Sequence, residues 1–221
     1  MVLADGVMEG RRTFGNIIKY IKITASSNFG NALTILGAST FMPFLPLLPI
    51  QILIQNLFCD FSQTTIPFDN VDEEYTRLPR RWSMRGIGRF MLVLGPVSSI
   101  FDLVTFYALW RMFGVETPGQ IALFRSGWFV EGVLSQILII HILSTQKIPF
   151  LQSTASWPLV VSTLVMAAIG FLLPTLLLGA SRGFTALPWN FSYWLILIVG
   201  AHFMLAQAVK LVFIKRFGEW I

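Results

Sequence analysis

Six apolar stretches run through this sequence and restrict its fold more than any other feature. A helix needs about 20 predominantly apolar residues to cross a bilayer, and most of the stretches have that length. Charged residues make up 12% of the chain, about half the share that is usual in soluble domains. The sequence therefore predicts an all-α membrane protein, a six-helix transmembrane bundle. The expected spans are residues 23–41, 50–66, 90–113, 124–143, 157–178 and 191–214.

The spacing of polar segments divides the chain into four parts. Residues 1–22 are polar and basic with apolar residues at helical spacing, which predicts a lead-in helix continuous with the first span. Residues 23–67 read as a first helical hairpin. Residues 68–88 are the longest polar segment and predict a loop with a short helix begun by Asp72. Residues 89–221 supply the four further spans.

Lysine and arginine are distributed unevenly between the two ends of the expected spans. With the N-terminus in the cytoplasm, the cytoplasmic face holds nearly all of them, and the opposite face has little beyond Arg125 and Arg182. Because cytoplasmic loops carry an excess of Lys and Arg, we expect both termini in the cytoplasm. The same bias explains the net charge of +5, so the lipid bilayer is an expected partner and nucleic acid is not. Cys59 is the single cysteine, which excludes an intramolecular disulfide.

Two polar clusters lie inside the first two apolar stretches, at residues 26–31 and 55–60. At helical spacing Asn28 and Asn31 share one face, and Asn56, Asp60 and Gln63 share another. An aspartate at the centre of a membrane helix costs roughly 2.5–3.5 kcal/mol on insertion scales, so an ionisable residue there indicates function. Interhelical hydrogen bonding by the amides is the alternative. Carboxylate and amide oxygens suit Mg²⁺ or Ca²⁺, so the clusters predict a cation site shared by two helices.

The third and fourth spans hold further polar residues. Glu131 and Gln136 lie in the fourth span, where Glu131 is either a ligand from a third helix or an interfacial group close to Arg125. Asp102 in the third span is either a helix-packing or an interfacial group. No Walker sequence, zinc-binding spacing or Ser/His/Asp arrangement is present, so the chain shows no catalytic chemistry of its own.

Several segments resemble the P-type ATPases. Residues 9–14 (EGRRTF), 16–22 (NIIKYIK) and 26–31 (SSNFGN) closely resemble the fifth transmembrane helix of that family and its stalk. Residues 55–60 (QNLFCD) resemble the sixth helix. The resemblance runs essentially from Leu3 to the C-terminus. The most specific matches are to the bacterial magnesium-translocating branch, in residues 66–72 (IPFDNVD), 127–130 (GWFV) and 134–136 (LSQ).

The resemblance implies roles for particular residues. The ion-site positions of the family fall on Asn28, Asn31, Asn56 and Asp60, with Mg²⁺ as the transported ion. Asn31 departs from the glutamate of the calcium pumps, which lowers the charge of the site. Cys59 stands where those pumps have a threonine, and a thiol is a poor ligand for Mg²⁺.

The resemblance also implies residues that couple the site to the rest of a pump. Arg11 and Arg12 lie in the stalk that transmits movement. Asp69 and Asp72 begin a loop like the one that contacts the phosphorylation domain in the family.

The catalytic sequences of the family do not occur in this chain. These are Asp-Lys-Thr-Gly-Thr, Thr-Gly-Glu, Gly-Asp-Gly-x-Asn-Asp and the Pro-Glu of the fourth helix. The resemblance therefore implies a membrane fragment of an ATP-driven Mg²⁺ transporter, in the bacterial inner membrane, that uses ATP only through catalytic domains in a missing N-terminal half. That half is expected in the same chain or in a separate polypeptide. Two alternatives remain: a non-enzymatic membrane subunit or regulator, and a fragment of a pump for another cation.

Overall fold

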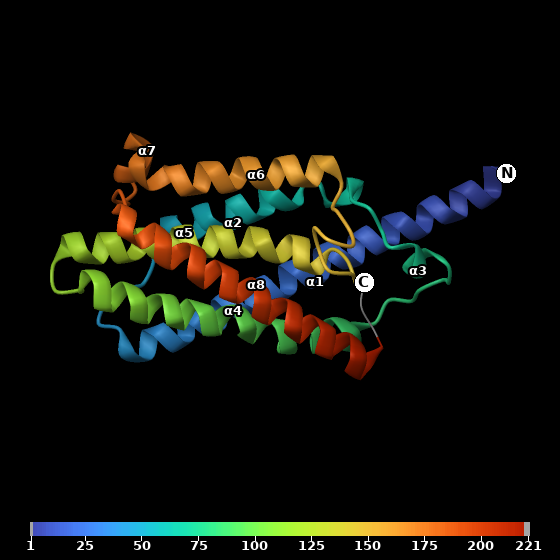
Figure 1. Cartoon of the computed structure of the whole chain (residues 1–221), viewed down its shortest axis with the longest axis horizontal. Helices are drawn as coiled ribbons and strands as arrows, with labels where there is room; N and C mark the ends of the chain where they lie inside the picture. Colours follow the sequence, from blue (N-terminus) through green and yellow to red (C-terminus); the bar gives the residue numbers. More distant parts are fainter. Residues whose placement is uncertain (1, 219–221) are drawn as a thin grey trace.

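The computed structural model describes residues 2–218 and is built from helices (Figure 1). Four short elements join the long helices: η1 (Ile66–Phe68), α3 (Glu73–Thr76), η2 (Leu173–Thr175) and α7 (Leu177–Ala180). Within the described residues there is no strand, only an isolated bridge between Pro149 and Ser153. The all-α prediction is confirmed. The six long helices are α1 (Val2–Phe41), α2 (Pro49–Gln63), α4 (Met84–Phe113), α5 (Pro118–Leu143), α6 (Trp157–Leu172) and α8 (Trp189–Phe217).

Local sequence signals set the limits of these helices. The Ser83 side chain accepts a hydrogen bond from the Gly86 amide at 3.1 Å and caps the start of α4. Thr117 and Gln120 form a capping box at the start of α5. Gly218 has a φ of 61°, a left-handed conformation that favours glycine, and it ends α8.

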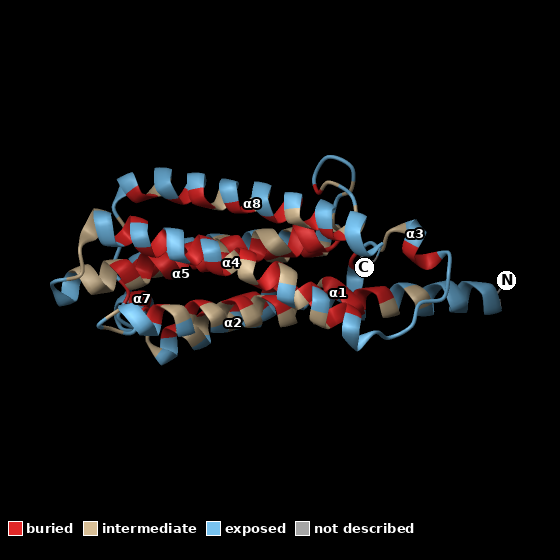
Figure 2. Cartoon of the chain, turned by 90° about the horizontal axis from the view of Figure 1, so that it is seen from below, coloured by how far each residue is buried: buried red, intermediate tan, exposed pale blue. Residues whose placement is uncertain are grey.

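The first helix, α1, joins the predicted lead-in to the first expected span without a break. Its 40 residues make it about 60 Å long, roughly twice the thickness of the bilayer hydrocarbon. The N-terminal part of α1 extends beyond the bundle, and residues 3–10 are exposed (Figures 1 and 2). One rigid element therefore connects this outer part to the polar cluster at residues 26–31.

Four segments are long and apolar enough to cross a membrane: α4, α5, α8 and residues 157–175. α5 is the central one. In its most apolar 18-residue stretch 83% of the residues are buried, compared with 22% in residues 157–175 and 33% in α8. The first two expected spans, residues 23–41 and 50–66, are not among these four candidates. α2 has 15 residues, about 22 Å of helix, and the polar clusters lower the hydropathy of both segments.

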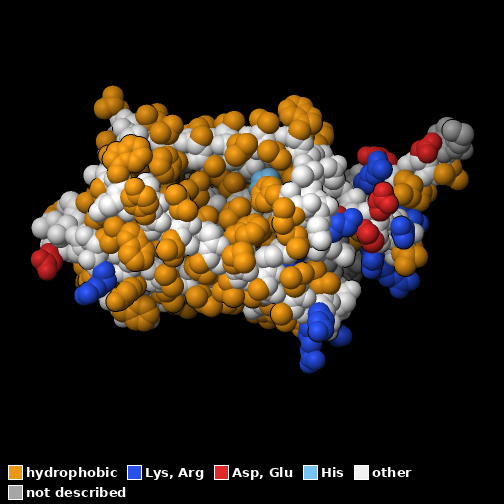
Figure 3. Space-filling model, in the orientation of Figure 1, with side chains coloured by type: hydrophobic (Ala, Val, Ile, Leu, Met, Phe, Trp, Pro, Cys, Tyr) orange, Lys and Arg blue, Asp and Glu red, His pale blue; other side chains and the backbone are white. Residues whose placement is uncertain are grey.

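The buried side chains form two main clusters, and both include residues of α5, a helix coloured largely as buried in Figure 2. One contains Phe106, Phe124 and Trp128, and the other contains Phe90 and Phe213. Large apolar side chains also cover the outside of the bundle, and charged side chains gather mainly at the end where the N-terminus lies (Figure 3). An apolar belt with charged ends is the surface expected of helices that face lipid.

The helices α1 and α4 cross at very close range. A Cβ atom added to Gly30 would lie 2.8 Å from the carbonyl oxygen of Gly95, too close for real atoms. The hydroxyl of Ser99 in α4 donates to the carbonyl of Gly30 at 2.8 Å. Glycine in the first polar cluster therefore serves the packing of α1 on α4.

Candidate cation site between α1, α2 and α5

The side chain of Gln136 in α5 connects the two polar clusters. Its Nε2 donates to Oδ1 of Asn31 in α1 at 3.0 Å. Its Oε1 accepts a hydrogen bond from the thiol of Cys59 in α2. Gln136 and Cys59 are both buried. The structure thus brings the predicted residues Asn31 of α1 and Gln136 of α5 together through one hydrogen bond.

A second link joins α1 directly to α2. The hydroxyl of Thr24 donates to Oε1 of Gln63 at 2.8 Å, and Gln63 is buried. In α2, Asp60 lies between Cys59 and Gln63, the two residues through which α2 is linked to α1. In α1, Asn28 lies between Thr24 and Asn31, the residues at the other ends of these links. The two helices therefore place Asn28 and Asp60 at a similar depth.

The remaining predicted ligands face outward. Asn28 and Asp60 are exposed and Asn56 is half-buried. Among residues 2–218 these three side chains take part in no hydrogen bond or ion pair. Asp60 and Gln63 line an open cavity of about 830 Å³ between α1 and the end of α2, together with Asn16. The structure therefore does not gather the four family positions around one point.

Glu131 is buried inside the bundle, with 1% of its surface exposed. Burial contradicts the interfacial interpretation of this residue. Its Oε2 atom has no hydrogen-bond partner among the described residues. A buried carboxyl oxygen without a partner is costly, so Glu131 retains an acceptor that is available to a ligand or a proton.

Asp102 joins three helices. Its Oδ2 accepts from the Thr34 hydroxyl of α1 at 2.5 Å, and its Oδ1 accepts from Nε1 of Trp128 in α5 at 2.7 Å. The side chain is buried, so the interfacial interpretation of Asp102 is wrong and the helix-packing one is confirmed. The sequence offered no signal for either partner, because both belong to other helices.

Oxygen donors of the kind that Mg²⁺ prefers, from amide and carboxyl groups, lie both inside the bundle and at its surface. Asn31, Gln136 and Glu131 supply them from inside the bundle, and Asp60 supplies one at its surface. Across residues 2–218 no three His, Cys, Asp or Glu side chains come together as a metal-binding group. The described residues therefore offer separate oxygen donors for a hard cation and no assembled metal site.

A buried ion pair fastens α1 to the segment after α2. Nζ of Lys19 lies 2.8 Å from Oδ2 of Asp69, and both side chains are 1% exposed. Lys19 also donates to the carbonyl of Asn70. Nδ2 of Asn16 donates to the carbonyls of Pro67 and Asp69, each at 3.0 Å. The contacts of Asn16 and Lys19 were not predicted from the sequence, although their i, i+3 spacing places them on one face of α1.

The same segment binds the loop between α5 and α6. The carboxylate of Asp72 accepts from the Thr145 hydroxyl at 3.0 Å and from the Gln146 amide at 2.7 Å. Oδ1 of Asp69 accepts from the Ser156 amide at 2.9 Å. Lys210 of α8 donates to three carbonyls near this loop, those of Ile142, Thr145 and Lys147. Asp69 and Asp72 therefore hold one network between α1, this loop and α8.

The two arginines expected to transmit movement have different surroundings. Nη1 of Arg11 donates to the carbonyls of Thr76 and Arg77, at 2.9 and 3.1 Å, and so contacts the loop after α3. Arg12 is exposed and pairs with Glu9 within α1 at 3.7 Å. The structure thus places Arg11, and not Arg12, against the loop.

The short helix α3 begins after Asp72 as the sequence predicted. A backbone hydrogen bond and then the charge of Lys147, 3.8 Å away, lower the pKa of Glu74. Burial raises the pKa of Tyr75, and the nearby Arg80 opposes that shift. Both residues therefore keep their ordinary charge states at neutral pH.

Comparison with known proteins gives one family. The family described as "Cation transporting ATPase, C-terminus" matches residues 44–212. A protein of Salmonella typhimurium strain LT2 named "Magnesium-transporting ATPase, P-type 1" is 51% identical over 220 residues, which are 100% of this chain and 24% of that protein. The protein of the same name from Escherichia coli strain K12 is 51% identical over 218 residues, 99% of this chain and 24% of its own length. The chain thus spans about a quarter of the length of these curated relatives.

Proposed function

The chain belongs to the cation-transporting ATPase family, of which it matches the C-terminal region, and we propose that it forms part of the membrane half of a pump that transports Mg²⁺. Oxygen donors from α1, α2 and α5 supply one side of the path of the ion. The remaining donors, and the use of ATP, come from the other half of such a pump. The magnesium in this proposal is supported by the names of the relatives and by the hard-ligand chemistry of the donors.

One observation carries the proposal: a polar face of α1 and α2 is left open. Asp60 and Asn28 are exposed and Asn56 is half-buried, at a depth where the rest of the bundle presents an apolar surface. Carboxylates and amides that face lipid are strongly disfavoured, so a further polar or helical partner is required to cover them. The other half of the proposed pump would cover this surface, and α1 and α2 would then complete six spans.

The side chains of Asn31, Gln136 and Cys59 are hydrogen-bonded to one another in this structure. Oδ1 of Asn31 accepts from Gln136, and Oε1 of Gln136 accepts from Cys59. For either oxygen to approach Mg²⁺, α1 or α2 must shift relative to α5. Mg²⁺ loses its water reluctantly, so a small shift that admits a partly hydrated ion suffices. The hydrogen bonds of Gln136 therefore mark a closed arrangement of the path.

Movement reaches this point through α1. Twelve residues separate Lys19 from Asn31, which is about 18 Å along a helix. Arg11 and Lys19 attach the outer part of α1 to the segment that contains Asp69 and Asp72. A displacement of that segment by a cytoplasmic domain is thus transmitted along one helix to Asn31. The proposal puts both termini on the cytoplasmic side of the inner membrane, and the charged end of the bundle supports this orientation (Figure 3).

The experiment that tests this proposal removes the charge of Asp60. The chain replaces the matching 220 residues of the Salmonella typhimurium relative, and Mg²⁺ uptake is measured for Asp60→Asn. Asp5→Asn, at an exposed site in the outer part of α1, is the matched control. We expect Asp60→Asn to weaken the apparent affinity for Mg²⁺ at least about tenfold, because a carboxylate ligand is lost. Wild-type affinity in Asp60→Asn would show that this side chain does not meet the ion.

A further inference from the structure

Asp102 of α4 carries its carboxylate inside the bundle, with 6% of the residue exposed. Its Oδ2 accepts from the Thr34 hydroxyl and its Oδ1 accepts from Nε1 of Trp128. Each oxygen thus has a donor, and hydrogen bonds of this kind favour the ionised form of a carboxyl group.

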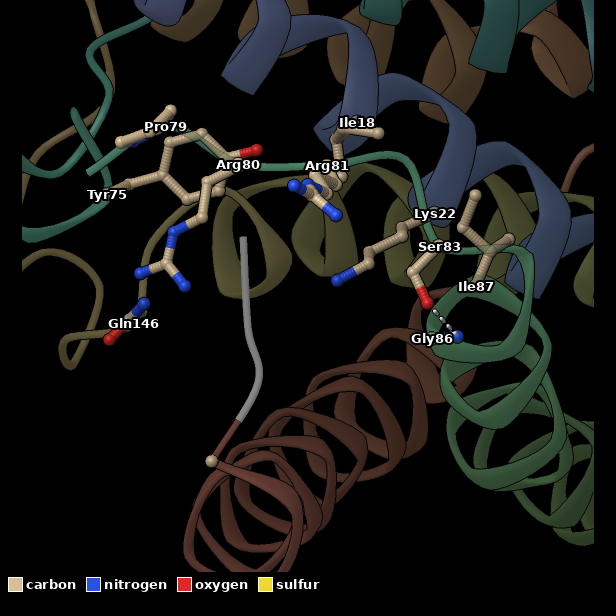
Figure 4. A pocket seen from close by; sticks show the side chains of 11 residues that line it. Ile18, Lys22, Tyr75, Pro79, Arg80, Arg81, Ser83, Gly86, Ile87 and Gln146 are labelled. Carbon is tan, nitrogen blue, oxygen red and sulfur yellow. Dashed lines mark hydrogen bonds between the residues drawn. The ribbon is translucent and has the colours of Figure 1, made fainter.

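Within the described residues no cation is paired with this carboxylate. None of the ion pairs found there includes Asp102. Lys22 is the last lysine or arginine of α1 and lies twelve residues before Thr34, which is about 18 Å along the helix. Figure 4 shows Lys22 with Arg80 and Arg81 around a cavity at the charged end of the bundle. The charge of Asp102 therefore stands alone at a depth where ionisable residues indicate function.

Asp102 lies close to the hydrogen bond that joins Asn31 to Gln136. Thr34 follows Asn31 by three residues in α1, so their side chains share a face and their Cβ atoms are about 5–6 Å apart. Nε2 of Gln136 donates to Oδ1 of Asn31 at 3.0 Å. The carboxylate that Thr34 holds is thus about one helical turn from two of the donors proposed for Mg²⁺, and it is hydrogen-bonded to neither.

Glu131 is the second buried carboxyl group of this region, one turn after Trp128 in α5. Its Oε2 has no hydrogen-bond partner among the described residues, whereas both oxygens of Asp102 have one. Asp102 is therefore the better stabilised anion of the two. The surroundings of its carboxylate are apolar, since Phe106 packs edge-on against Trp128 with 4.7 Å between the ring centres. A charge in such surroundings is weakly screened and acts over a longer distance than in water.

We propose that Asp102 supplies negative charge to the ion path without contacting the ion, and that this charge sets the affinity for a divalent cation. The inference rests on the proposed function. Asn31 and Gln136 are neutral, so they offer oxygen atoms but no charge. A fixed anion attracts a divalent cation twice as strongly as a monovalent one at the same distance. Asp102 is thus a positioning residue, held by Thr34 and Trp128 from two other helices.

The test removes the charge and keeps the packing. This chain replaces the matching 220 residues of the Salmonella typhimurium relative, and Mg²⁺ uptake driven by ATP is measured against Mg²⁺ concentration for Asp102→Asn. The asparagine Oδ1 can still accept from Trp128, and its Nδ2 can donate to Thr34, whose hydroxyl can then donate to the Gly30 carbonyl at 3.1 Å. Asp5→Asn makes the same change of charge at an exposed site and is the matched control.

We expect Asp102→Asn to raise the Mg²⁺ concentration for half-maximal uptake at least about tenfold and to leave the maximal rate within about twofold, because only binding is weakened. Asp5→Asn is expected to change neither. Asn31→Asp/Asp102→Asn returns one carboxylate to the path and is expected to recover most of the affinity. No recovery in this double variant would contradict a role of charge.

A lower maximal rate and a lower unfolding temperature of Asp102→Asn, with unchanged affinity, would make Asp102 a packing residue only and overturn the inference. Weakened affinity in Asp60→Asn beside wild-type affinity in Asp102→Asn would overturn this inference and leave the proposed function standing. A chimera that carries no Mg²⁺ would overturn both.

Discussion

The Lys19–Asp69 pair is the most deeply buried ion pair among the described residues, and its loss has a clear expected cost. Replacing Lys19 by Met leaves the Asp69 carboxylate buried without its cation. Breaking one side of a buried pair costs about 3–5 kcal/mol. We expect Lys19→Met to lower the thermal unfolding temperature of the chain in detergent, and Lys19→Met/Asp69→Asn to recover part of the loss because no charge is then stranded.

The exposed pair between Lys147 and Glu74 supplies the control for this measurement. Its side chains are 45% and 54% exposed and lie 3.8 Å apart, so solvent screens their attraction. Lys147→Met is expected to leave the unfolding temperature unchanged. Equal unfolding temperatures for Lys19→Met and the double variant would contradict the idea that a stranded charge causes the loss.

For single residues, the sequence predicts which side chains could bind a cation better than it predicts which side chains they contact. The types and spacing of Asn31, Gln136 and Asp60 predicted oxygen donors for a hard cation. The spacing along one helix does not determine which helix stands opposite, so the bridge from Asn31 through Gln136 to Cys59 could not be read from it. The outward position of Asp60 follows from the way α2 packs against its neighbouring helices, which is a tertiary property.

The crossing of α1 and α4 provides a test at the scale of the helix. Gly30→Ala would place its Cβ 2.8 Å from the carbonyl of Gly95, whereas a Cβ on Gly37 of the same helix meets nothing within 4 Å. Overpacking costs about 1–3 kcal/mol, while Gly to Ala in an open helix position gains up to about 1 kcal/mol. We expect Gly30→Ala to lower the unfolding temperature and Gly37→Ala to leave it equal or higher.

The same two variants also test how closely α1 and α4 approach each other at this crossing. If Gly30→Ala and Gly37→Ala unfold at the same temperature, α1 and α4 do not approach as closely as the structure places them. Both variants are measured in the same detergent, so a difference between their unfolding temperatures comes from the substitutions.

The elements themselves were largely predictable from the sequence. The lead-in and first span merged into α1, the helix begun after Asp72 formed as α3, and Pro174 lies where α6 gives way to η2. Apolar runs and proline act locally, so a sequence reports them well. The length of α2 was less predictable, because the helix ends at Gln63 before the apolar run ends and Ile66 begins a 3₁₀ turn.

On the scale of the whole molecule, the chain is a bundle around α5 with one incomplete side. Four segments are long and apolar enough to be candidate spans, whereas α1 and α2 present Asn28, Asn56 and Asp60 on an open face. The other half of the proposed pump would cover this open face. No sequence pattern within the chain shows what covers that face.

The central claim is that this chain forms part of the ion path of a Mg²⁺ pump, and replacement within a relative tests it most directly. The chain is substituted for the matching 220 residues of the Salmonella typhimurium relative, and Mg²⁺ uptake driven by ATP is measured in vesicles. We predict that the chimera transports Mg²⁺ and that Asp60→Asn weakens its affinity while Asp5→Asn does not. A chimera that is inserted in the membrane and forms a phosphoenzyme but carries no Mg²⁺ would contradict the claim.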